Sequence, residues 1–367
     1  MSFPFGTNYG GVLQCYALSQ ELIKLGHNVE FLRYRYQPVS RIHNLTQTFK
    51  TSYSITNFTK RFINSLRYRI SARHNTAESM RLPAFDKFRE KYFKFTPILD
   101  KHTIGEYLNN NFDAVIIGSD QVWTDIATDE KIFFGDWQPA FKGMTISYAA
   151  CSAHKAISGK IRPVFKNLLA GFDIITVRDE TTATLVSSIT GQSPSIVPDP
   201  TLLHDFKELH TSGSGITESP YILTYILGNP ISGGHHEALR RIKDKISKDC
   251  KIVGIVTDST HKSLIRELDI TIYDAGPEEW INLMKGAEAV YTDSFHAILF
   301  SMKYNIPFVA YYRDAIRSSR LINLKQAYSL DGIVDKASSI VTLSRHQEST
   351  RNLTTIIPQL DNRHGGQ

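Results

Sequence analysis

Residues 287–302 hold an acid, a hydroxyl and an imidazole between two apolar runs. Residues 287–291 are typical of a buried strand, and residues 295–302 of an apolar helix. The join between them contains Asp293, and His296 follows at the start of the helix. Ligands of open α/β sheets bind at the carboxyl edge of the strands, where such a join lies. Since histidine exchanges protons near neutral pH, we expect His296 and Asp293 to act in acid–base catalysis. A histidine that only caps the helix is the alternative.

A second join carries an acid, an amide and an aromatic ring. The apolar run 115–117 is followed by Asp120, Gln121 and Trp123. We expect Asp120 and Gln121 to hydrogen-bond sugar hydroxyls, and the Trp123 indole to stack on a pyranose face. The alternative is that Asp120 caps the following turn.

A third join ends in an arginine. Arg178 follows an apolar strand pattern, and Asp179 is placed to cap the next helix. The guanidinium group matches the geometry of a carboxylate or a phosphate. We therefore expect Arg178 to bind an anion, unless it pairs with Asp199 or Glu180.

A fourth join, at residues 151–154, contains a cysteine and a histidine. A Cys–His pair is one arrangement for nucleophilic catalysis. Cys151 lies among small residues, however, and a buried free cysteine usually behaves as a small hydrophobe. We expect Cys151 to be structural and His154 to be a polar group of the acceptor site.

Glycines open the first expected helix. Paired glycines let the backbone approach a ligand, and a helix N-terminus favours an anion. We expect Asn8, Tyr9, Gly10 and Gly11 to contact the acceptor. An ordinary glycine turn is the alternative. The run 1–5 before them is too short for a central strand.

Apolar strand patterns alternate with amphipathic helical patterns along the chain, which is typical of a parallel sheet covered on both faces. Helices are expected at residues 11–25, 83–92 and 344–357. Strands are expected at residues 29–32, 114–117, 146–149, 174–177, 196–197, 221–227, 252–256, 270–273, 289–291 and 308–311.

These elements predict an α/β protein of two Rossmann-like domains, residues 1–210 and 211–342. The small polar residues 211–215 are the expected linker. A basic helical insertion, residues 37–100, interrupts the first domain. Residues 343–367 are expected to form a helix that crosses back to the first domain, followed by a tail.

Composition indicates a globular protein with an uneven charge. The 367 residues are 41% hydrophobic, and no apolar run reaches the length of about 18 residues that a membrane span needs. We expect no secretion signal at the start, and reduced thiols because the three cysteines lie far apart. Between Arg33 and Lys101 there are 15 Lys and Arg but 4 Asp and Glu, although the net charge is +6. This block attracts anions, unless it is a solvated helix face.

Together, the motifs resemble the polysaccharide pyruvyl transferase family, and the resemblance covers nearly the whole chain. It implies a glycosyltransferase-B-like fold. It also implies transfer of the enolpyruvyl carbons of phosphoenolpyruvate to a sugar as a cyclic ketal. The stretches that carry the resemblance are residues 8–18, 118–123, 147–150, 177–179, 198–203, 292–296 and 319–324.

The resemblance also implies that Arg178 and His296 match donor-site positions. Some members have an arginine two residues before the histidine, where this chain has Ser294. Another cation must then help to bind the donor, and Arg313, Arg317 and Arg320 are the candidates. The expected donor-binding residues are Arg178, Ser294, Phe295, Arg317 and Arg320.

The expected mechanism is acid–base chemistry without a metal or a cofactor, with phosphoenolpyruvate as co-substrate. His296, kept protonated by Asp293, protonates the vinylic carbon, and Asp120 is a base or an acceptor clamp. The expected acceptor is a hexose of a bacterial surface polysaccharide, with an undecaprenyl-diphosphate-linked glycan as one form. We expect no nucleic-acid partner, a cytoplasmic location and peripheral contact with the inner face of the cytoplasmic membrane.

Two other functions fit parts of the sequence. A nucleotide-sugar glycosyltransferase of the same fold would place a diphosphate at Gly233 and Gly234, before a helix. A glycan- or lipid-binding protein without catalysis would use the basic block and its apolar stripe as the binding surface.

Overall fold

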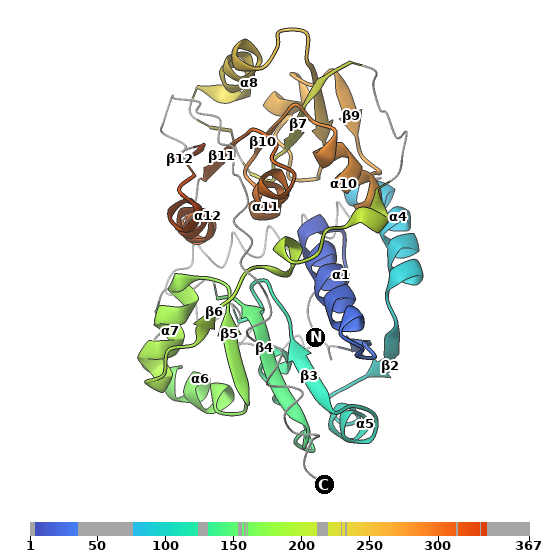
Figure 1. Cartoon of the computed structure of the whole chain (residues 1–367), viewed down its shortest axis with the longest axis vertical. Coiled ribbons are helices and arrows are strands. Elements are labelled where there is room, and N and C mark those ends of the chain that lie inside the picture. The colour runs from blue at the N-terminus through green and yellow to red at the C-terminus, as the bar shows by residue number, and fades with distance from the viewer. Residues whose placement is uncertain are drawn as a thin grey trace, which may run out of the picture.

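The computed structural model describes residues 4–35, 76–123, 131–210 apart from 153–155, 158 and 160, 219–312 apart from 229 and 232, and 315–335 apart from 331. Every strand pairing within these residues is parallel. The strands form two groups, one in each half of the molecule, with helices against them (Figure 1). The expected α/β class with two Rossmann-like halves is therefore confirmed.

The second half contains one six-stranded sheet in the order β9-β8-β7-β10-β11-β12. Renumbered along the chain from β7, this is the order 3-2-1-4-5-6 of a doubly wound fold, whose ligand site lies where the order reverses, between β7 and β10. Its elements are β7 (Tyr221–Tyr225), α8 (Gly234–Lys245), β8 (Lys251–Ile255), α9 (Lys262–Ile265), β9 (Ile270–Ile272), α10 (Pro277–Lys285), β10 (Ala289–Thr292), α11 (Phe295–Lys303), β11 (Phe308–Tyr312), α12 (Ala315–Tyr328) and β12 (Ile333–Asp335).

The first half contains two parallel sheets, β1-β2 and β3-β4-β5-β6. Its elements are α1 (Tyr9–Lys24), β1 (Phe31–Tyr34), α4 (Ala77–Tyr92), β2 (Phe95–Leu99), α5 (Ile104–Asn111), β3 (Ala114–Ile117), the 3₁₀ helix η1 (Ile132–Phe134), β4 (Met144–Ala150), α6 (Arg162–Leu169), β5 (Ile174–Val177), α7 (Glu180–Thr190), β6 (Ser195–Ile196), and the 3₁₀ helices η2 (Pro200–Leu202) and η3 (Lys207–Leu209).

The first helix begins two residues earlier than expected because Asn8 caps it. The Asn8 side chain accepts a hydrogen bond from the Gly11 amide (3.2 Å), which satisfies one of the amides left open at a helix start. The helix ends before Gly26, which has a φ of +91°. Its first ten residues include nine buried ones, so its N-terminal part lies in the core.

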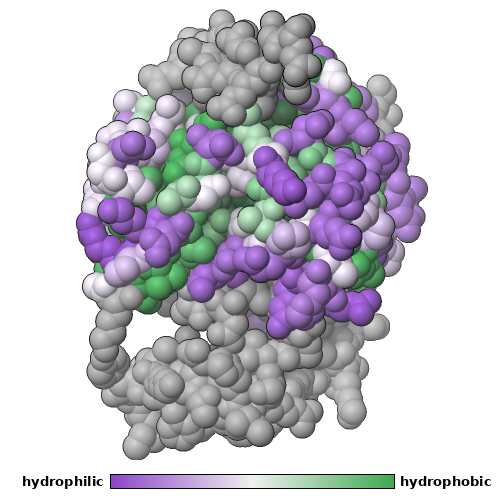
Figure 2. Space-filling view, turned by 90° about the horizontal axis from the view of Figure 1, so that it is seen from below, coloured by the Kyte–Doolittle hydropathy of each residue, from purple (hydrophilic) through white to green (hydrophobic). Residues whose placement is uncertain are grey.

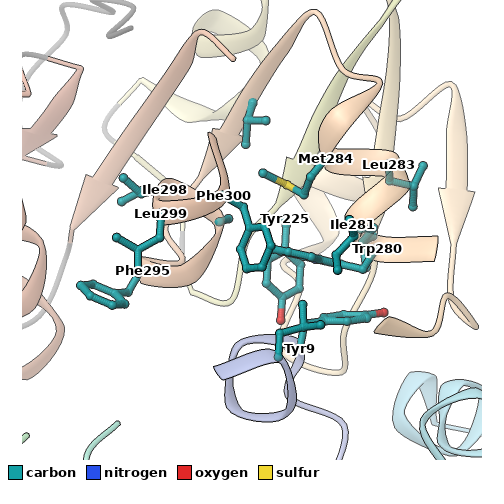
Figure 3. Packing of buried hydrophobic residues seen from close by; sticks show 14 of the residues in the cluster. Tyr9, Tyr225, Trp280, Ile281, Leu283, Met284, Phe295, Ile298, Leu299 and Phe300 are labelled. Carbon is teal, nitrogen blue, oxygen red and sulfur yellow. The ribbon is translucent and has the colours of Figure 1, made fainter. Parts of the chain in front are cut away.

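A single apolar core joins helices of the first half to the second half. The Tyr9 ring stacks on Trp280 of α10 with 5.5 Å between centroids, and the Tyr9 hydroxyl donates to the Ala275 carbonyl (2.7 Å). Figure 3 shows Tyr9 below Tyr225 and Trp280, at the point where α1 meets the second half. From α4, the buried Arg81 donates to the Val256 carbonyl (2.7 Å). Because α1 and α4 pack on the second half, the two halves share packing that fixes their relative position.

Most expected elements agree with the structure, and the differences have physical causes. Helix α4 begins at Ala77, six residues before the expected start, because Thr76 caps it and Pro83 lies inside it. Two short strands, β2 and β12, were not expected, so the predicted helical insertion 37–100 was wrong where it includes β2. The expected linker 211–215, the apolar stripe of the basic block and the crossing helix 344–357 lie outside the described residues.

Helix α12 makes a contact between the halves. Asn323 of α12 donates to the Thr181 hydroxyl of α7 (2.9 Å).

In the described part of the chain, none of the helices combines the length and the apolar character that a membrane crossing requires.

Candidate active site

Charged side chains from three chain segments of the first half meet at the carboxyl edge of its sheet. Asp120 follows β3, Arg178 follows β5, and Asp199 follows β6. The backbone turns sharply at Asp120, which has a φ of +75°, and a bridge from Asp120 to Ala150 holds it beside β4. Parallel strands bring residues that are distant in sequence to one edge, as the sequence analysis expected.

Arg178 is buried between two carboxylates. Its Nη1 donates to Asp199 Oδ2 (2.8 Å), and its Nη2 donates to Asp120 Oδ1 (3.4 Å). The side chain is 3% exposed. Burial alone would lower the pKa of Arg178, but Cys151 and the neighbouring carboxylates raise it above its ordinary value. Pairing with Asp199, which the sequence analysis left open as an alternative to anion binding, is therefore present.

The Asp199 carboxylate contacts most of the other residues of this cluster. One oxygen, Oδ1, accepts from the amide and the hydroxyl of Thr201 (3.0 and 2.8 Å). The other, Oδ2, accepts from Arg178 and from the Ser119 hydroxyl (3.1 Å). Burial would raise the pKa of Asp199, but His296, Arg178 and the Thr201 amide outweigh it, and the pKa lies well below its ordinary value. The carboxylate is therefore ionised throughout the neutral range.

His296 brings the second half into the same cluster. Its Nε2 lies 3.6 Å from Asp199 Oδ2, within ion-pair range, and the residue is 6% exposed. The imidazole packs against the α1 backbone at Gly10, where an added Cβ would lie 2.0 Å from His296 Nδ1. Only glycine leaves room for the ring there. A guanidinium of one half and an imidazole of the other thus meet at one carboxylate.

The expected partnership of His296 with Asp293 was wrong. Asp293 Oδ1 accepts a hydrogen bond from the Leu227 amide (2.6 Å). Within the described chain, the carboxylate at ion-pair distance from His296 is Asp199. Asp293 follows β10 and Leu227 follows β7, and these strands are neighbours in the sheet. The backbone amide at the end of β7 therefore takes the carboxylate that the sequence placed beside the histidine.

Phe295 lies between two arginines. The guanidinium carbon of Arg178 is 4.5 Å from the ring centroid, and that of Arg320 is 5.9 Å from it. The face of an aromatic ring attracts a cation at such distances. Arg320 Nη1 also lies 3.6 Å from Asp120 Oδ1. Burial would raise the pKa of Asp120, but Arg178, His296 and Arg320 hold it below its ordinary value.

Two more of the expected donor-site residues, Ser294 and Arg317, belong to α11 and α12, the helices that carry Phe295 and Arg320. Ser294 is buried at the N-cap position of α11, next to Phe295. Arg317 lies in α12, one helical turn before Arg320, but its side chain is outside the described part of the chain. Arg313 and His154 also lie outside the described residues.

Two of the expected acceptor residues belong to the core instead. Trp123 is fully buried, its ring stacks on Phe134 at 5.9 Å, and its Nε1 donates to the Phe133 carbonyl (3.1 Å). Tyr9 is fully buried against Trp280. Neither ring can stack on a sugar, because aromatic side chains of this size also serve as core residues and the sequence alone does not separate the two roles.

The other acceptor candidates remain near the cluster. Asn8 is exposed at the start of α1, Gly10 and Gly11 are buried in its first turn, and Gly10 lies against the His296 ring. Gln121 directly follows Asp120, and its Nε2 is buried. Their role in acceptor binding stays a prediction.

Three polar atoms of the cluster are buried without a hydrogen-bond partner in the described residues: Arg178 Nε, Gln121 Nε2 and His296 Nε2. Most buried polar atoms in folded proteins are hydrogen-bonded. Neighbouring buried polar atoms that lack hydrogen-bond partners, and that lie next to ionised groups, are suited to bind a polar ligand.

Cys151 is structural, as expected. Its Sγ lies 3.2 Å from Asp179 Oδ2, to which the thiol donates. Burial is the main cause that raises the pKa of Cys151 to about 12. The thiol therefore stays protonated and is a poor nucleophile.

One group of described residues has the spacing of metal ligands, namely His204, Asp205 and Glu208. Nδ1 of His204 already lies 2.7 Å from Glu21 Oε1, and Nε2 lies 2.5 Å from Glu208 Oε1. Both ring nitrogens are thus used in a hydrogen-bond network, which includes none of the residues around Asp199.

Several solved structures are similar to this chain at low identity. UDP-GlcNAc 2-epimerase from Methanocaldococcus jannaschii is 14% identical, covering 68% of this chain and 77% of that one, with a TM-score of 0.43. Arabidopsis thaliana UGT89C1 complexed with UDP-L-rhamnose is 13% identical, covering 89% and 83%, with a TM-score of 0.43. E. coli heptosyltransferase WaaC with ADP is 11% identical, covering 91% and 98%, with a TM-score of 0.38. No curated protein matches the sequence.

A family model gives a more specific result. The model of polysaccharide pyruvyl transferase matches residues 8–315, most of the chain. The matched region begins at the cap of α1 and includes Arg178, Asp199 and His296. The chain therefore belongs to the polysaccharide pyruvyl transferase family.

Proposed function

We propose that this protein transfers the enolpyruvyl carbons of phosphoenolpyruvate to a hexose of a bacterial surface polysaccharide, or of its lipid-linked precursor, as a cyclic ketal. The observation that supports this most strongly is the meeting of Arg178 and His296 at Asp199, with Arg178 Nε buried without a hydrogen-bond partner among the described residues. The reaction needs an anion-binding cation and a proton donor at one place, and this cluster contains both.

The charges of the cluster limit how the donor binds. Phosphoenolpyruvate carries about three negative charges, since a phosphate monoester has nearly two and the carboxylate has one. The guanidinium groups of Arg178 and Arg320 are balanced by Asp120 and Asp199. The donor therefore needs further positive charge, which we assign to protonated His296, the N-terminus of α1 and Arg317.

The proposed reaction has two stages. His296 gives its proton to the terminal vinylic carbon of phosphoenolpyruvate, and one sugar hydroxyl attacks the resulting oxocarbenium carbon. The proton of this hydroxyl passes to His296. Phosphate then leaves, a neighbouring hydroxyl attacks the same carbon, and its proton leaves with the phosphate. The products are the ketal and inorganic phosphate, and these steps are acid–base chemistry that requires no metal or cofactor.

The two carboxylates have different parts in this scheme. Asp199 gives the protonated imidazole a counter-charge and holds Arg178 in place, so it is a positioning residue. Asp120 has a lowered pKa and is a weak base. We therefore assign Asp120 to clamping an acceptor hydroxyl rather than to removing its proton.

We place the acceptor sugar at Asn8, Gly10 and Gly11 at the start of α1 and at Gln121, which follows Asp120. An undecaprenyl-diphosphate-linked glycan carries a diphosphate, an anion of the kind that the basic block, residues 33–101, would attract. This acceptor would place the enzyme at the inner face of the cytoplasmic membrane, without a nucleic-acid partner.

Two measurements test the proposal. Phosphoenolpyruvate is expected to raise the thermal unfolding midpoint, whereas UDP- and ADP-sugars are expected to leave it unchanged, because a ligand stabilises the state it binds. Candidate lipid-linked glycans incubated with enzyme and phosphoenolpyruvate are expected to gain the mass of a pyruvate ketal and to release phosphate. Stabilisation by a nucleotide sugar together with glycosyl transfer would support the glycosyltransferase alternative instead.

A further inference from the structure

Two arginines from different halves of the molecule approach the same oxygen of Asp120. Arg178 Nη2, from the first half, lies 3.4 Å from Asp120 Oδ1, and Arg320 Nη1, from α12 of the second half, lies 3.6 Å from it. Both guanidinium groups also lie near the Phe295 ring. Two cations that share one oxygen atom repel each other unless a negative charge lies between them, and the Asp120 carboxylate supplies that charge.

Asp120 is held more loosely than Asp199. Asp199 accepts from Arg178 at 2.8 Å, and its side chain is 1% exposed. It also accepts hydrogen bonds from Thr201 and Ser119. The contacts of Asp120 with the two arginines are longer than the usual distance of about 2.7–3.2 Å, and its side chain is 13% exposed. Asp120 is therefore the carboxylate of the cluster that an incoming anion can replace.

Solvent reaches Asp120 from the side of the second half. Asp120 and Arg178 follow β3 and β5, at the carboxyl edge of the first-half sheet, and the Arg320 side chain beside them is 17% exposed. Figure 2 views the molecule from below, at the end of the first half that lies away from the second half, where hydrophilic side chains are interspersed with apolar surface. The charged cluster lies at the other end of this sheet, so a ligand reaches it from between the halves.

The backbone keeps Asp120 at the end of β3 independently of the arginines. Its φ is +75°, and its carbonyl accepts from the amides of Val122 (2.8 Å) and Cys151 (3.0 Å). A residue other than glycine in this conformation costs about 1–3 kcal/mol and persists only where the surrounding structure holds it. The carboxylate therefore stays next to Gln121 when it no longer bonds an arginine, and it can then accept from a neutral ligand.

An anionic donor and Asp120 compete for the same two guanidinium groups. The guanidinium fork binds phosphate and carboxylate oxygens with the same geometry. Phosphoenolpyruvate has about three negative charges, whereas Asp120 has one, so the donor is the stronger partner. A sugar hydroxyl is neutral and cannot take Asp120 from an arginine, because charge-assisted hydrogen bonds are about twice as strong as neutral ones.

We propose, on the basis of the proposed function, that Asp120 is an internal competitor of the donor. Phosphoenolpyruvate displaces it from Arg178 and Arg320, and the released carboxylate then binds the acceptor hydroxyl. The acceptor therefore binds well only after the donor has taken the arginines. Because such coupling is reciprocal, the acceptor also strengthens the binding of the donor.

The first test measures the binding of phosphoenolpyruvate and of inorganic phosphate by titration calorimetry. Asp120→Asn should bind both anions at least about fivefold more tightly than the parent protein, because the competitor is removed. This variant should fold, since asparagine also adopts a left-handed backbone and Arg178 keeps its bond to Asp199. The control Glu180→Gln removes an exposed carboxylate two residues after Arg178, and it should change both dissociation constants by less than about twofold. Equal or weaker binding to Asp120→Asn would overturn the proposal.

A second pair of variants separates competition from the general effect of removing a negative charge. In an Arg320→Gln background, Asp120→Asn should tighten anion binding by a smaller factor, because one of the two contested guanidinium groups is absent. Repulsion between Asp120 and the anion alone does not depend on Arg320. An equal gain in both backgrounds would therefore overturn the proposal.

The released carboxylate is tested with a glycan that gains the mass of the ketal. Asp120→Asn should lower the KM for phosphoenolpyruvate and also lower kcat by about tenfold or more, because the acceptor loses a charged hydrogen-bond partner. A damaged site would raise the KM, and an unchanged kcat would overturn the role in acceptor binding. Tighter binding of inorganic phosphate, without any binding of phosphoenolpyruvate, would reject the proposed function but support the competition at the arginines.

Discussion

Asp120 and Asp293 occupy equivalent places in the two halves but have opposite roles. Each lies just beyond a strand of the parallel sheet of its half, β3 in the first half and β10 in the second. In the second half, the central strand β7 is present, and the Leu227 amide at its end binds Asp293. In the first half, β3 pairs with β4, and Asp120 accepts a hydrogen bond from the Arg178 side chain (3.4 Å). The groups beside each strand end therefore decide whether its carboxylate binds a backbone amide, as Asp293 does, or an arginine side chain, as Asp120 does.

The halves also differ in the kind of side chain that they give to the cluster. The first half supplies the fixed charges of Arg178, Asp120 and Asp199, which are bonded to one another. The second half supplies His296, which can change its charge, and the Phe295 ring that packs on Arg178. A rigid charged half and a half with the proton donor suit a reaction in which charge develops on the ligand.

The largest effect is expected when the proton donor is removed. His296→Ala should lower the rate of ketal formation by about 10²–10⁴-fold, the usual contribution of a general acid. The matched control is His236→Ala, an exposed histidine of the same half that bonds Glu267. Phosphate release and product mass are measured for both variants, with circular dichroism to compare folding. Near-normal turnover of folded His296→Ala protein would reject the assigned role.

A second comparison separates Asp199, which lies beside His296, from Asp293, which the sequence analysis expected there. Asp199→Asn should destabilise the fold by about 3–5 kcal/mol, because it leaves the buried Arg178 without its closest counter-charge. Asp293→Asn should cost about 1 kcal/mol or less, because the amide oxygen still accepts the Leu227 hydrogen bond. Urea unfolding of both variants measures the difference. An equal loss of unfolding free energy in the two variants would contradict the role of Asp199 as the counter-charge of Arg178.

The Asp199→Asn variant also tests how the free energy of unfolding depends on pH. The pKa of Asp199 is lowered in the folded protein, so its stabilisation is present above the unfolded-state pKa of about 3.9 and is lost as the pH falls below it. Stability of the parent protein should therefore fall steeply with acid below about pH 4. The slope should be smaller in Asp199→Asn than in the parent protein.

The sequence predicted the positions of the charged strand ends but not their partners. The ends of β3, β5 and β10 were recognisable because apolar runs stop there at polar residues, and so Asp120, Arg178 and His296 were identified. Asp199 was considered only as a partner of Arg178, since the exposed two-residue strand β6 before it gives a weak pattern. Its signal was Pro-Asp-Pro, in which the aspartate caps the 3₁₀ helix η2.

Pairing between distant segments could not be predicted, because it depends on strand order and on the approach of the two halves. The same pattern of an aromatic residue after a turn fits a sugar platform and a core residue, and Trp123 is the latter. The strands β2 and β12 were missed because each is short and adjoins a helix. Asp293 was misassigned because the competing donor, the Leu227 amide, lies 66 residues away in sequence.

A smaller effect is expected where α1 touches the second half. Gly10→Ala should displace the His296 ring, because the added Cβ would overlap it. A displacement of about 1 Å from the reactive geometry can cost about 10²-fold in rate. The control is Gly159→Ala, where an added Cβ meets nothing within 4 Å. In a His296→Ala background, Gly10→Ala should cause no further loss, because the two residues then no longer conflict. Additive losses would show that Gly10 acts separately from His296.

The smallest effect is expected at Cys151, the strand-end residue whose neighbours would suggest a nucleophile. The pKa of its thiol is raised to about 12, so almost no thiolate forms at pH 8. Iodoacetamide at that pH should leave activity unchanged and should not label Cys151 in the folded protein, whereas unfolded protein should take up label at all three cysteines. Cys151→Ala should keep ketal formation within about twofold, since the step needs no thiol. Loss of activity in proportion to labelling of Cys151 would instead place the thiol in the reaction and move the chemistry from the His296 side of the cluster to the β4 side.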